Sequence, residues 1–159
     1  HDGSNWRVRA LAAEDLRERV HAADPALLAG HLPRLLDLVM SLVEDANFKV
    51  EITALQIVGA LVALPGGHVA SHGPRLLPPL LRKLGDNKAL VRQANMRVLV
   101  HLTQLLPPRA MVEPLLQALR SDAWRVREEG LTLLMAAMLH HFPPGGPAPR
   151  DAQALDPVL

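Results

Sequence analysis

The sequence contains no cysteine and very few aromatic residues. Of its 159 residues, two are Trp, two are Phe and none is Tyr. The absence of cysteine excludes a disulfide framework and any site built on thiolates. No apolar run reaches the roughly 18 residues of a membrane-spanning helix, because charges or prolines interrupt the longest runs. The formal net charge of +1 is too small to indicate nucleic-acid binding, which needs a concentrated basic surface.

The sequence is instead rich in aliphatic residues and contains a repeated pattern. Hydrophobic residues make up 49% and charged residues 21%, so we expect a folded chain with a buried core. Four similar segments recur, GSNWRVRALAA, DANFKVEITAL, DNKALVRQANM and SDAWRVREEGL. Their shared valines, Val8, Val50, Val91 and Val126, are 42, 41 and 35 residues apart. Such a spacing, with two helical segments per unit, predicts an all-α solenoid of HEAT-like repeats.

The apolar periodicity and the positions of proline and glycine divide the chain into units. The predicted repeats occupy approximately residues 1–22, 24–66, 68–107 and 108–142, followed by a Pro/Gly loop at 143–150 and the start of a further repeat at 151–159. Within them we expect helices over residues 6–20, 24–45, 48–64, 90–106, 109–119 and 124–141. Pro78 and Pro79 should kink or restart the first helix of the third unit, since proline removes a backbone donor and crowds the preceding turn. We expect residues 1–159 to form a single domain and, because the chain starts at His1 without Met, to be part of a longer chain.

One position in each unit collects the rare aromatic residues. In a solenoid of helix pairs, the turns between the first and second helices all emerge on one edge of the stack. Two positions before the shared valines stand Trp6, Phe48, Ala89 and Trp124, and the next positions hold Arg7, Lys49, Leu90 and Arg125. Trp and Arg are enriched among the residues that contribute most to binding at protein interfaces. The pattern therefore predicts a protein-binding edge.

The charge at this edge is more positive than that of the chain as a whole. In the third turn, whose tip is Asp86-Asn87-Lys88, the available cation is Lys88. Further cations near the turns are Arg9, Arg92, Arg120 and Arg127, whereas the acids Glu14, Asp15, Glu18, Asp24 and Asp37 lie away from the turn tips. We therefore expect an acidic partner.

A structural role for some of these residues is the alternative. A hydrophobic residue at the start of each second helix can wedge against the next repeat, as in a hydrophobic staple. This alternative applies to Trp6, Phe48 and Trp124. The arginines one place after the valines, Arg9, Arg92 and Arg127, are expected to pair with turn aspartates of neighbouring units.

The segments NWRVRALAAEDL, DANFKVEITALQIVGAL, DNKALVRQANMRVLVHL and SDAWRVREEGLTLL resemble TOG domains, the HEAT-repeat arrays of microtubule regulators. The resemblance covers most of residues 4–141, and Trp6 on the first turn is its most specific match. It is greatest to the crescerin type (TOG array regulators of axonemal microtubules), with the CLASP type second. It implies a paddle whose turn edge binds the acidic surface of αβ-tubulin or the microtubule lattice, without catalysis of its own. Position by position, the implied tubulin contacts are Trp6, Arg7, Phe48, Lys49, Asn87, Lys88, Trp124 and Arg125.

The same resemblance implies the setting in which the chain acts. It implies a monomeric module within a larger multi-domain protein, with neither nucleic acid nor membrane as a partner. The implied location is the cytoskeleton in the cytoplasm, with the cilium or axoneme and the centrosome as specific sites.

The sequence does not predict catalysis or a metal site. His68 and His72 are four residues apart, but they lie in GGHVASHGP and lack the glutamate of a zinc-binding HExxH helix. No nucleophile–base pair and no phosphate-binding glycine loop after a strand can be placed, so we expect neither an enzyme nor a cofactor. Two alternatives to tubulin binding stay open. One is a generic HEAT-repeat adaptor that binds a peptide or protein partner on its concave face, and the other is a nucleic-acid-binding helical repeat.

Overall fold

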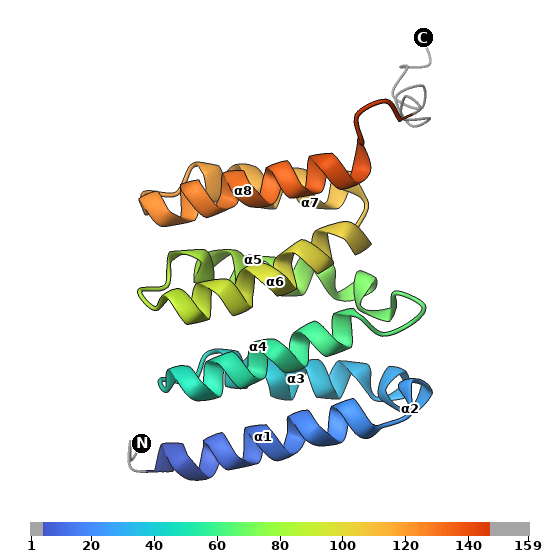
Figure 1. Cartoon of the computed structure of the whole chain (residues 1–159), viewed down its shortest axis with the longest axis vertical. Coiled ribbons are helices and arrows are strands. Elements are labelled where there is room, and N and C mark those ends of the chain that lie inside the picture. Colours follow the sequence, from blue (N-terminus) through green and yellow to red (C-terminus); the bar gives the residue numbers. More distant parts are fainter. Residues whose placement is uncertain (1–4, 147–159) are drawn as a thin grey trace.

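The computed structural model describes residues 5–146 as a stack of helices (Figure 1). Its α-helices are α1 (Trp6–Ala22), α2 (Pro25–Gly30), α3 (Leu32–Val43), α4 (Phe48–Val62), α5 (Gly73–Arg82), α6 (Ala89–Leu105), α7 (Pro108–Leu119) and α8 (Trp124–His141). Two short 3₁₀ helices, η2 (His68–His72) and η3 (Lys83–Gly85), precede and follow α5. No strand occurs in residues 5–146, and none of the helices there is long and apolar enough to cross a membrane. The predicted all-α solenoid is confirmed.

The helices form two rows. Figure 1 shows α1, α4, α6 and α8 side by side in one row, with α3, α5 and α7 behind them, and neighbouring members of the front row are in contact. Each rear helix packs on a front helix of its own pair, α3 on α4, α5 on α6 and α7 on α8. Each pair therefore runs out along one row and back along the other, as the repeat pattern predicts.

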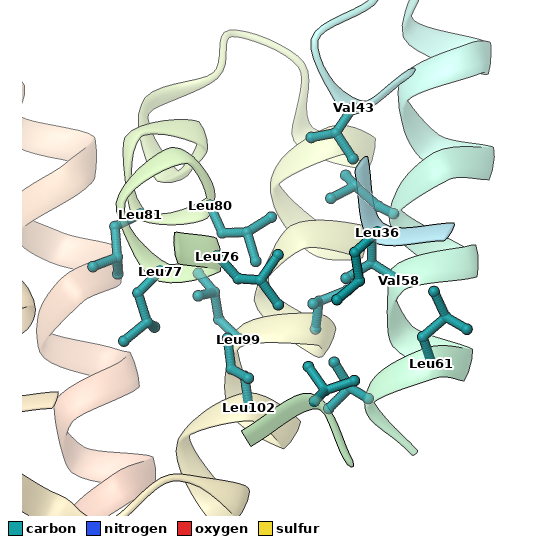
Figure 2. Packing of buried hydrophobic residues seen from close by; sticks show 14 of the residues in the cluster. Leu36, Val43, Val58, Leu61, Leu76, Leu77, Leu80, Leu81, Leu99 and Leu102 are labelled. Carbon is teal, nitrogen blue, oxygen red and sulfur yellow. The ribbon is translucent and has the colours of Figure 1, made fainter. Parts of the chain in front are cut away.

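Aliphatic side chains fill the space between the two rows. Figure 2 shows leucines of α5 and α6 packed together, with Leu36 and Val58 close to them. Leu36, Leu76 and Leu99 are fully buried, and burying a leucine stabilises a fold by about 1.5–3 kcal/mol relative to leaving it in water. None of the four aromatic residues is fully buried, since Trp6 and Phe48 are half-buried and Trp124 and Phe142 are exposed.

The exposure of the four shared valines differs between the first repeat and the others. Val50, Val91 and Val126 are buried, and their helices pack both on the first helix of their own pair and on the preceding repeat. Val8 is 66% exposed, because none of the described residues supplies a helix that precedes and covers α1.

Two helix predictions are wrong in detail. The helix expected over residues 24–45 is divided at His31 into α2 and α3. Pro33 lies in the first turn of α3, where its missing N–H is tolerated, so the chain starts a new helix there instead of continuing the old one. Asp24 caps α2 by accepting a hydrogen bond from the backbone N–H of Ala26 at 3.0 Å.

The predicted interruption at Pro78 and Pro79 does not occur, since α5 runs through both residues as one α-helix. The carbonyls that lose their donors belong to Pro74 and Arg75, which are both exposed, so water can satisfy them. The remaining boundaries differ little from the prediction, since α4 ends at Val62 and α6 covers Ala89–Leu105. The predicted loop at 143–150 is described only as far as Gly146, and the predicted further repeat at 151–159 lies outside the described residues.

Candidate functional site

The turns between the two rows share one edge of the stack. In Figure 1 the start of α1, the α3–α4 turn, the η3–α6 turn and the α7–α8 turn all lie on the left side. The position that collects the aromatic residues is the first residue of each front helix, namely Trp6, Phe48, Ala89 and Trp124. We call these four segments bends one to four, and the surface they form the bend edge.

Polar side chains order the second and third bends. In the second bend, Asn47 accepts a hydrogen bond from the N–H of Lys49 at 2.9 Å, and Asp45 accepts one from the N–H of Asn47 at 2.8 Å. In the third bend, Asp86 accepts from the N–H of Lys88 at 2.8 Å. The Asn47 side chain thus caps α4, and the two aspartates satisfy backbone donors within their bends.

Lysines of the second and third bends reach back to the aromatic ring of the preceding bend. Nζ of Lys49 lies 5.3 Å from the ring centroid of Trp6, and Nζ of Lys88 lies 5.5 Å from that of Phe48. Both distances are within the range of cation–π attraction, worth about 0.5–1 kcal/mol at an exposed site. We call this alternation of rings and lysines the aromatic–cation ladder. It keeps the ammonium groups at the edge while leaving Lys49 and Lys88 exposed.

Arginines of the first and fourth bends cover the ring next to them in sequence. The guanidinium of Arg7 lies 5.1 Å from the Trp6 ring centroid, and that of Arg125 lies 5.0 Å from the Trp124 centroid. The third bend has Ala89 at the aromatic position, so Arg125 finds no ring in the preceding bend. Its Nη1 instead lies 3.5 Å from Oδ1 of Asn87, a long contact.

The structural alternative, in which the aromatic residues act as hydrophobic staples, applies to some of them and not to others. Phe48 is half-buried and packs against the aliphatic core, while Trp6 is half-buried. Trp124 is 59% exposed, so it does not act as a buried wedge. Phe48 both packs against the core and lies under the ammonium group of Lys88, so in this bend one ring serves packing and the placement of charge.

An ion pair joins the first repeat to the second bend. Arg9 donates from Nε to Oδ2 of Asp45 at 2.8 Å and from Nη2 to Oδ1 at 3.2 Å. This two-point hydrogen bond from Arg9 is the main cause of the lowered pKa of the Asp45 carboxyl, which burial partly opposes. The predicted pairing of Arg9 with a turn aspartate of the neighbouring unit is confirmed.

The same prediction is wrong for the other two arginines. Arg92 donates to the backbone carbonyl of Asp86 at 2.6 Å. Arg127 donates to the carbonyls of Ser121 at 2.7 Å and Asp122 at 3.0 Å. Each guanidinium thus folds back on its own bend, where turn carbonyls without a helical partner offer nearer acceptors than a neighbouring carboxylate.

A second ion pair, absent from the sequence prediction, lies beneath the second and third bends. Nζ of Lys83 in η3 is 3.2 Å from Oε2 of Glu51 in α4, and both side chains are largely buried. Burial is the main influence on Glu51 and raises the pKa of its carboxyl, although Lys83 acts in the opposite direction. Glu51, the only acidic residue of the largely apolar helix α4, is the sequence signal that could have indicated this pair.

The face of the front helices carries a groove of about 790 Å³ between α1, α4 and α6. Two arginines line it, but Arg17 donates to Glu14 at 2.5 Å and also to Gln56. Glu18 lines the groove as well. The positive charge of this groove is thus partly offset by acids. Within the part of the chain that the structure describes, no three His, Asp or Glu side chains gather as a metal site.

Comparisons with known proteins place the chain among microtubule-associated relatives. It is 34% identical over 124 residues, 77% of the chain, to the CLIP-associated protein of Arabidopsis thaliana. It is 26% identical over 159 residues, 99% of the chain, to TOG array regulator of axonemal microtubules protein 1 of Mus musculus. It is 29% identical over 139 residues, 86% of the chain, to the crescerin-like protein che-12 of Caenorhabditis elegans.

These matches cover only 9%, 9% and 11% of the three relatives' own lengths. No protein-family model matches the chain, and no solved structure matches it. The similarity to both groups of relatives extends over most of the chain and agrees with its helical repeats. The chain is therefore a TOG-type HEAT-repeat segment, homologous to parts of the CLIP-associated proteins and of the TOG array regulators of axonemal microtubules.

Proposed function

We propose that this chain is a tubulin-binding module that regulates microtubule dynamics, and that it binds αβ-tubulin or the microtubule lattice through the bend edge. The observation that carries the proposal is the aromatic–cation ladder, which holds lysines at one edge of the stack across neighbouring repeats. The name of the Mus musculus relative, TOG array regulator of axonemal microtubules protein 1, supports the same partner.

We assign the proposed tubulin contacts from the exposure and charge of the side chains on the bend edge. Arg7, Lys49 and Lys88 are exposed cations on the bend edge, and they steer and orient an acidic partner. The proposed contact residues are Trp6, Arg7, Phe48, Lys49, Asn87, Lys88, Trp124 and Arg125. The rings supply rigid apolar area beside the charges, which suits a protein interface.

The adaptor alternative places the partner in the groove along the front helices. That groove is less suited to an acidic partner, because Arg17 is already bound to Glu14 and Glu18 lines the same surface. The exposed lysines that lie over aromatic rings, Lys49 and Lys88, are on the bend edge instead. We therefore favour the bend edge as the principal binding surface.

In this proposal the chain binds and does not catalyse. It acts as a monomeric module of a larger protein, with tubulin rather than nucleic acid or membrane as its partner. Its proposed location is the microtubule cytoskeleton of the cytoplasm, with the axoneme and the centrosome as the specific sites to examine.

The test is co-elution of the purified chain with tubulin on a size-exclusion column at low salt. We expect the wild type to co-elute, and the double variant Trp6→Glu, Lys49→Glu to elute separately, because it replaces a ring and a cation with charges that repel an acidic partner. The matched control is Phe142→Glu, Arg109→Glu, which changes one exposed aromatic residue and one exposed cation at the opposite end of the helices. Absence of co-elution by the wild type, or equal co-elution of both double variants, would contradict the proposal.

A further inference from the structure

In each of the first two bends an ionisable side chain follows the aromatic residue by three positions. Arg9 comes three residues after Trp6 on α1, and Glu51 comes three residues after Phe48 on α4. Residues three apart in a helix lie on the same side of it, so each ionisable side chain lies on the same side as the ring. Each also forms an ion pair with a residue of the next repeat.

Contacts between the first and second bends form a closed network. Arg9 donates twice to Asp45, and Oδ1 of Asp45 accepts from the N–H of Asn47 at 2.8 Å. Asn47 in turn caps α4 by accepting from the N–H of Lys49 at 2.9 Å. Nζ of Lys49 then returns to Trp6, on the same helix as Arg9, and lies 5.3 Å from its ring centroid. We call these five residues the first bend network.

The second and third bends repeat this arrangement with the charges exchanged. Nζ of Lys83 lies 3.2 Å from Oε2 of Glu51. The carbonyl of Lys83 accepts from the N–H of Asp86 at 3.0 Å, and Oδ1 of Asp86 accepts from the N–H of Lys88 at 2.8 Å. Nζ of Lys88 then returns to Phe48, on the same helix as Glu51, and lies 5.5 Å from its ring centroid. We call these five residues the second bend network.

The third and fourth bends lack such a network. Ala89 stands in the place of the ring, and Arg92, three residues later, donates to the carbonyl of Asp86 in its own bend. Arg125 lies over the ring of Trp124, also in its own bend. None of the ion pairs found within residues 5–146 joins these two bends. The combination of an ion pair and a ring–lysine contact therefore joins bends one, two and three only.

Stability alone does not account for the two ion pairs. The side chains of Asp45, Glu51 and Lys83 are largely buried, and taking charges out of water offsets much of the attraction between them. A charge-assisted hydrogen bond does restrict the geometry of the groups that it joins. In both networks the restricted group is a bend whose lysine lies over a ring. A lysine held in this way loses less freedom when a partner binds it.

We propose that the ion pairs Arg9–Asp45 and Glu51–Lys83 position the ring–lysine pairs of the first three bends for tubulin binding. The inference rests on the proposed tubulin-binding function, and it assigns these four residues no direct contact with tubulin. The first three bends then meet the partner as one preformed surface, whereas the fourth bend contributes independently. It follows that losing an ion pair weakens binding only while the lysine that it positions is present.

The test compares dissociation constants for tubulin in a mutant cycle, with the helix content of each variant checked by circular dichroism. The double variant Arg9→Met, Asp45→Asn removes the first ion pair without leaving a charge unpaired, and its new amide oxygen can still accept from the N–H of Asn47. We expect it to weaken binding about two- to tenfold, the cost of ordering one long side chain on binding. In a Lys49→Ala background the same double substitution should have no further effect.

The second network is tested independently. Glu51→Gln, Lys83→Met should weaken binding to a similar extent, and it should have no further effect in a Lys88→Ala background. Each network thus has its own cycle, so the test does not depend on the folding of one variant.

Tryptophan fluorescence tests the positioning without tubulin. The chain has two tryptophans, so in a Trp124→Phe background the emission comes from Trp6 alone. We expect acrylamide to quench this emission more strongly when Arg9→Met, Asp45→Asn is added, because Lys49 then covers the ring for less of the time. Unchanged quenching would contradict the positioning role.

The matched control is Arg19→Met, Asp15→Asn, which makes the same two substitutions in an exposed ion pair of α1, away from the bend edge. It should change neither the dissociation constant nor the quenching. If the wild type binds and loss of the Arg9–Asp45 pair has no effect, or weakens binding equally in the Lys49→Ala background, the positioning role is wrong while tubulin binding stands. If the wild type does not bind at all, the proposed function fails and this inference fails with it.

Discussion

The ammonium group of Lys49 lies over the indole ring of Trp6, with Nζ 5.3 Å from the ring centroid. The two residues come from different repeats, 43 positions apart in sequence. The contact therefore couples neighbouring bends and restricts a lysine that would otherwise move freely in water. Such restriction reduces the side-chain entropy that is lost when the lysine meets a partner.

A double-mutant cycle on Trp6→Ala and Lys49→Ala should show this coupling. We expect the two substitutions to be non-additive in the free energy of unfolding by about 0.5–1 kcal/mol, the size of an exposed cation–π contact. Urea unfolding followed by circular dichroism measures it. Pairing Trp6→Ala with Lys88→Ala is the control, because Lys88 lies over Phe48 instead, and that pair should be additive. Equal coupling in both cycles would contradict the ladder.

The Arg9–Asp45 pair should make stability depend on acid pH. The pKa of Asp45 is lowered in the folded state, so between that value and the ordinary aspartate pKa only the unfolded chain takes up the proton. The stabilisation is present above the ordinary value and is lost as the pH falls through the lowered one. We expect Asp45→Asn to destabilise by about 1–2 kcal/mol at neutral pH, with the difference from wild type shrinking in acid. Urea unfolding at a series of pH values tests this, and a difference that does not vary with pH would contradict it.

A variant without Lys83 should become more stable in acid, whereas the stabilisation by the Arg9–Asp45 pair is lost in acid. Lys83→Met leaves the Glu51 carboxylate without its partner in a largely buried place, and we expect a loss of about 2–3 kcal/mol at neutral pH. The pKa of Glu51 is already raised and should rise further, so the folded variant takes up a proton before the unfolded chain does. Its stability should fall as the pH rises through the raised pKa and recover in acid.

Thermal melts over a pH series measure this effect. The double variant Lys83→Met, Glu51→Gln is the control, because a neutral amide in place of the carboxylate removes the charge that is left unpaired. It should regain most of the lost stability at neutral pH and lose the pH dependence. A single variant as stable as wild type would show that the pair contributes little.

Gly59→Ala should stabilise the chain. Gly59 lies in the interior of α4, and an added Cβ would lie 3.7 Å from Cγ2 of Val98, an ordinary van der Waals contact. Alanine in a helix interior is favoured over glycine by about 0.5–1 kcal/mol, so the melting temperature should rise. Gly73→Ala is the contrasting variant, because its Cβ would lie 2.6 Å from the buried Leu106, and it should lower the melting temperature. A decrease for Gly59→Ala would show that the groove tolerates no added methyl group.

Local signals in the sequence predicted most of the fold. The starts of α4 and α8 are at the predicted residues, and α6 begins one residue earlier than expected. Apolar residues at helical spacing and the polar residues or prolines at helix ends act over a few neighbours, and this is why they can be read without a structure. The same local reasoning failed at Pro78 and Pro79, because an exposed carbonyl can bond to water whether or not the helix continues.

The sequence alone determined that the rare rings and the cations recur at one position of a helical repeat, since spacing along the chain sets position within each unit. Only the tertiary structure decided which ring each cation meets: Lys49 lies over Trp6 and Lys88 over Phe48. It also decided that Arg92 and Arg127 fold back on their own bends, and that Leu90 stays in water. Contacts between repeats join residues about forty positions apart, and they depend on how each helix pair is stacked on the next, which no local pattern encodes.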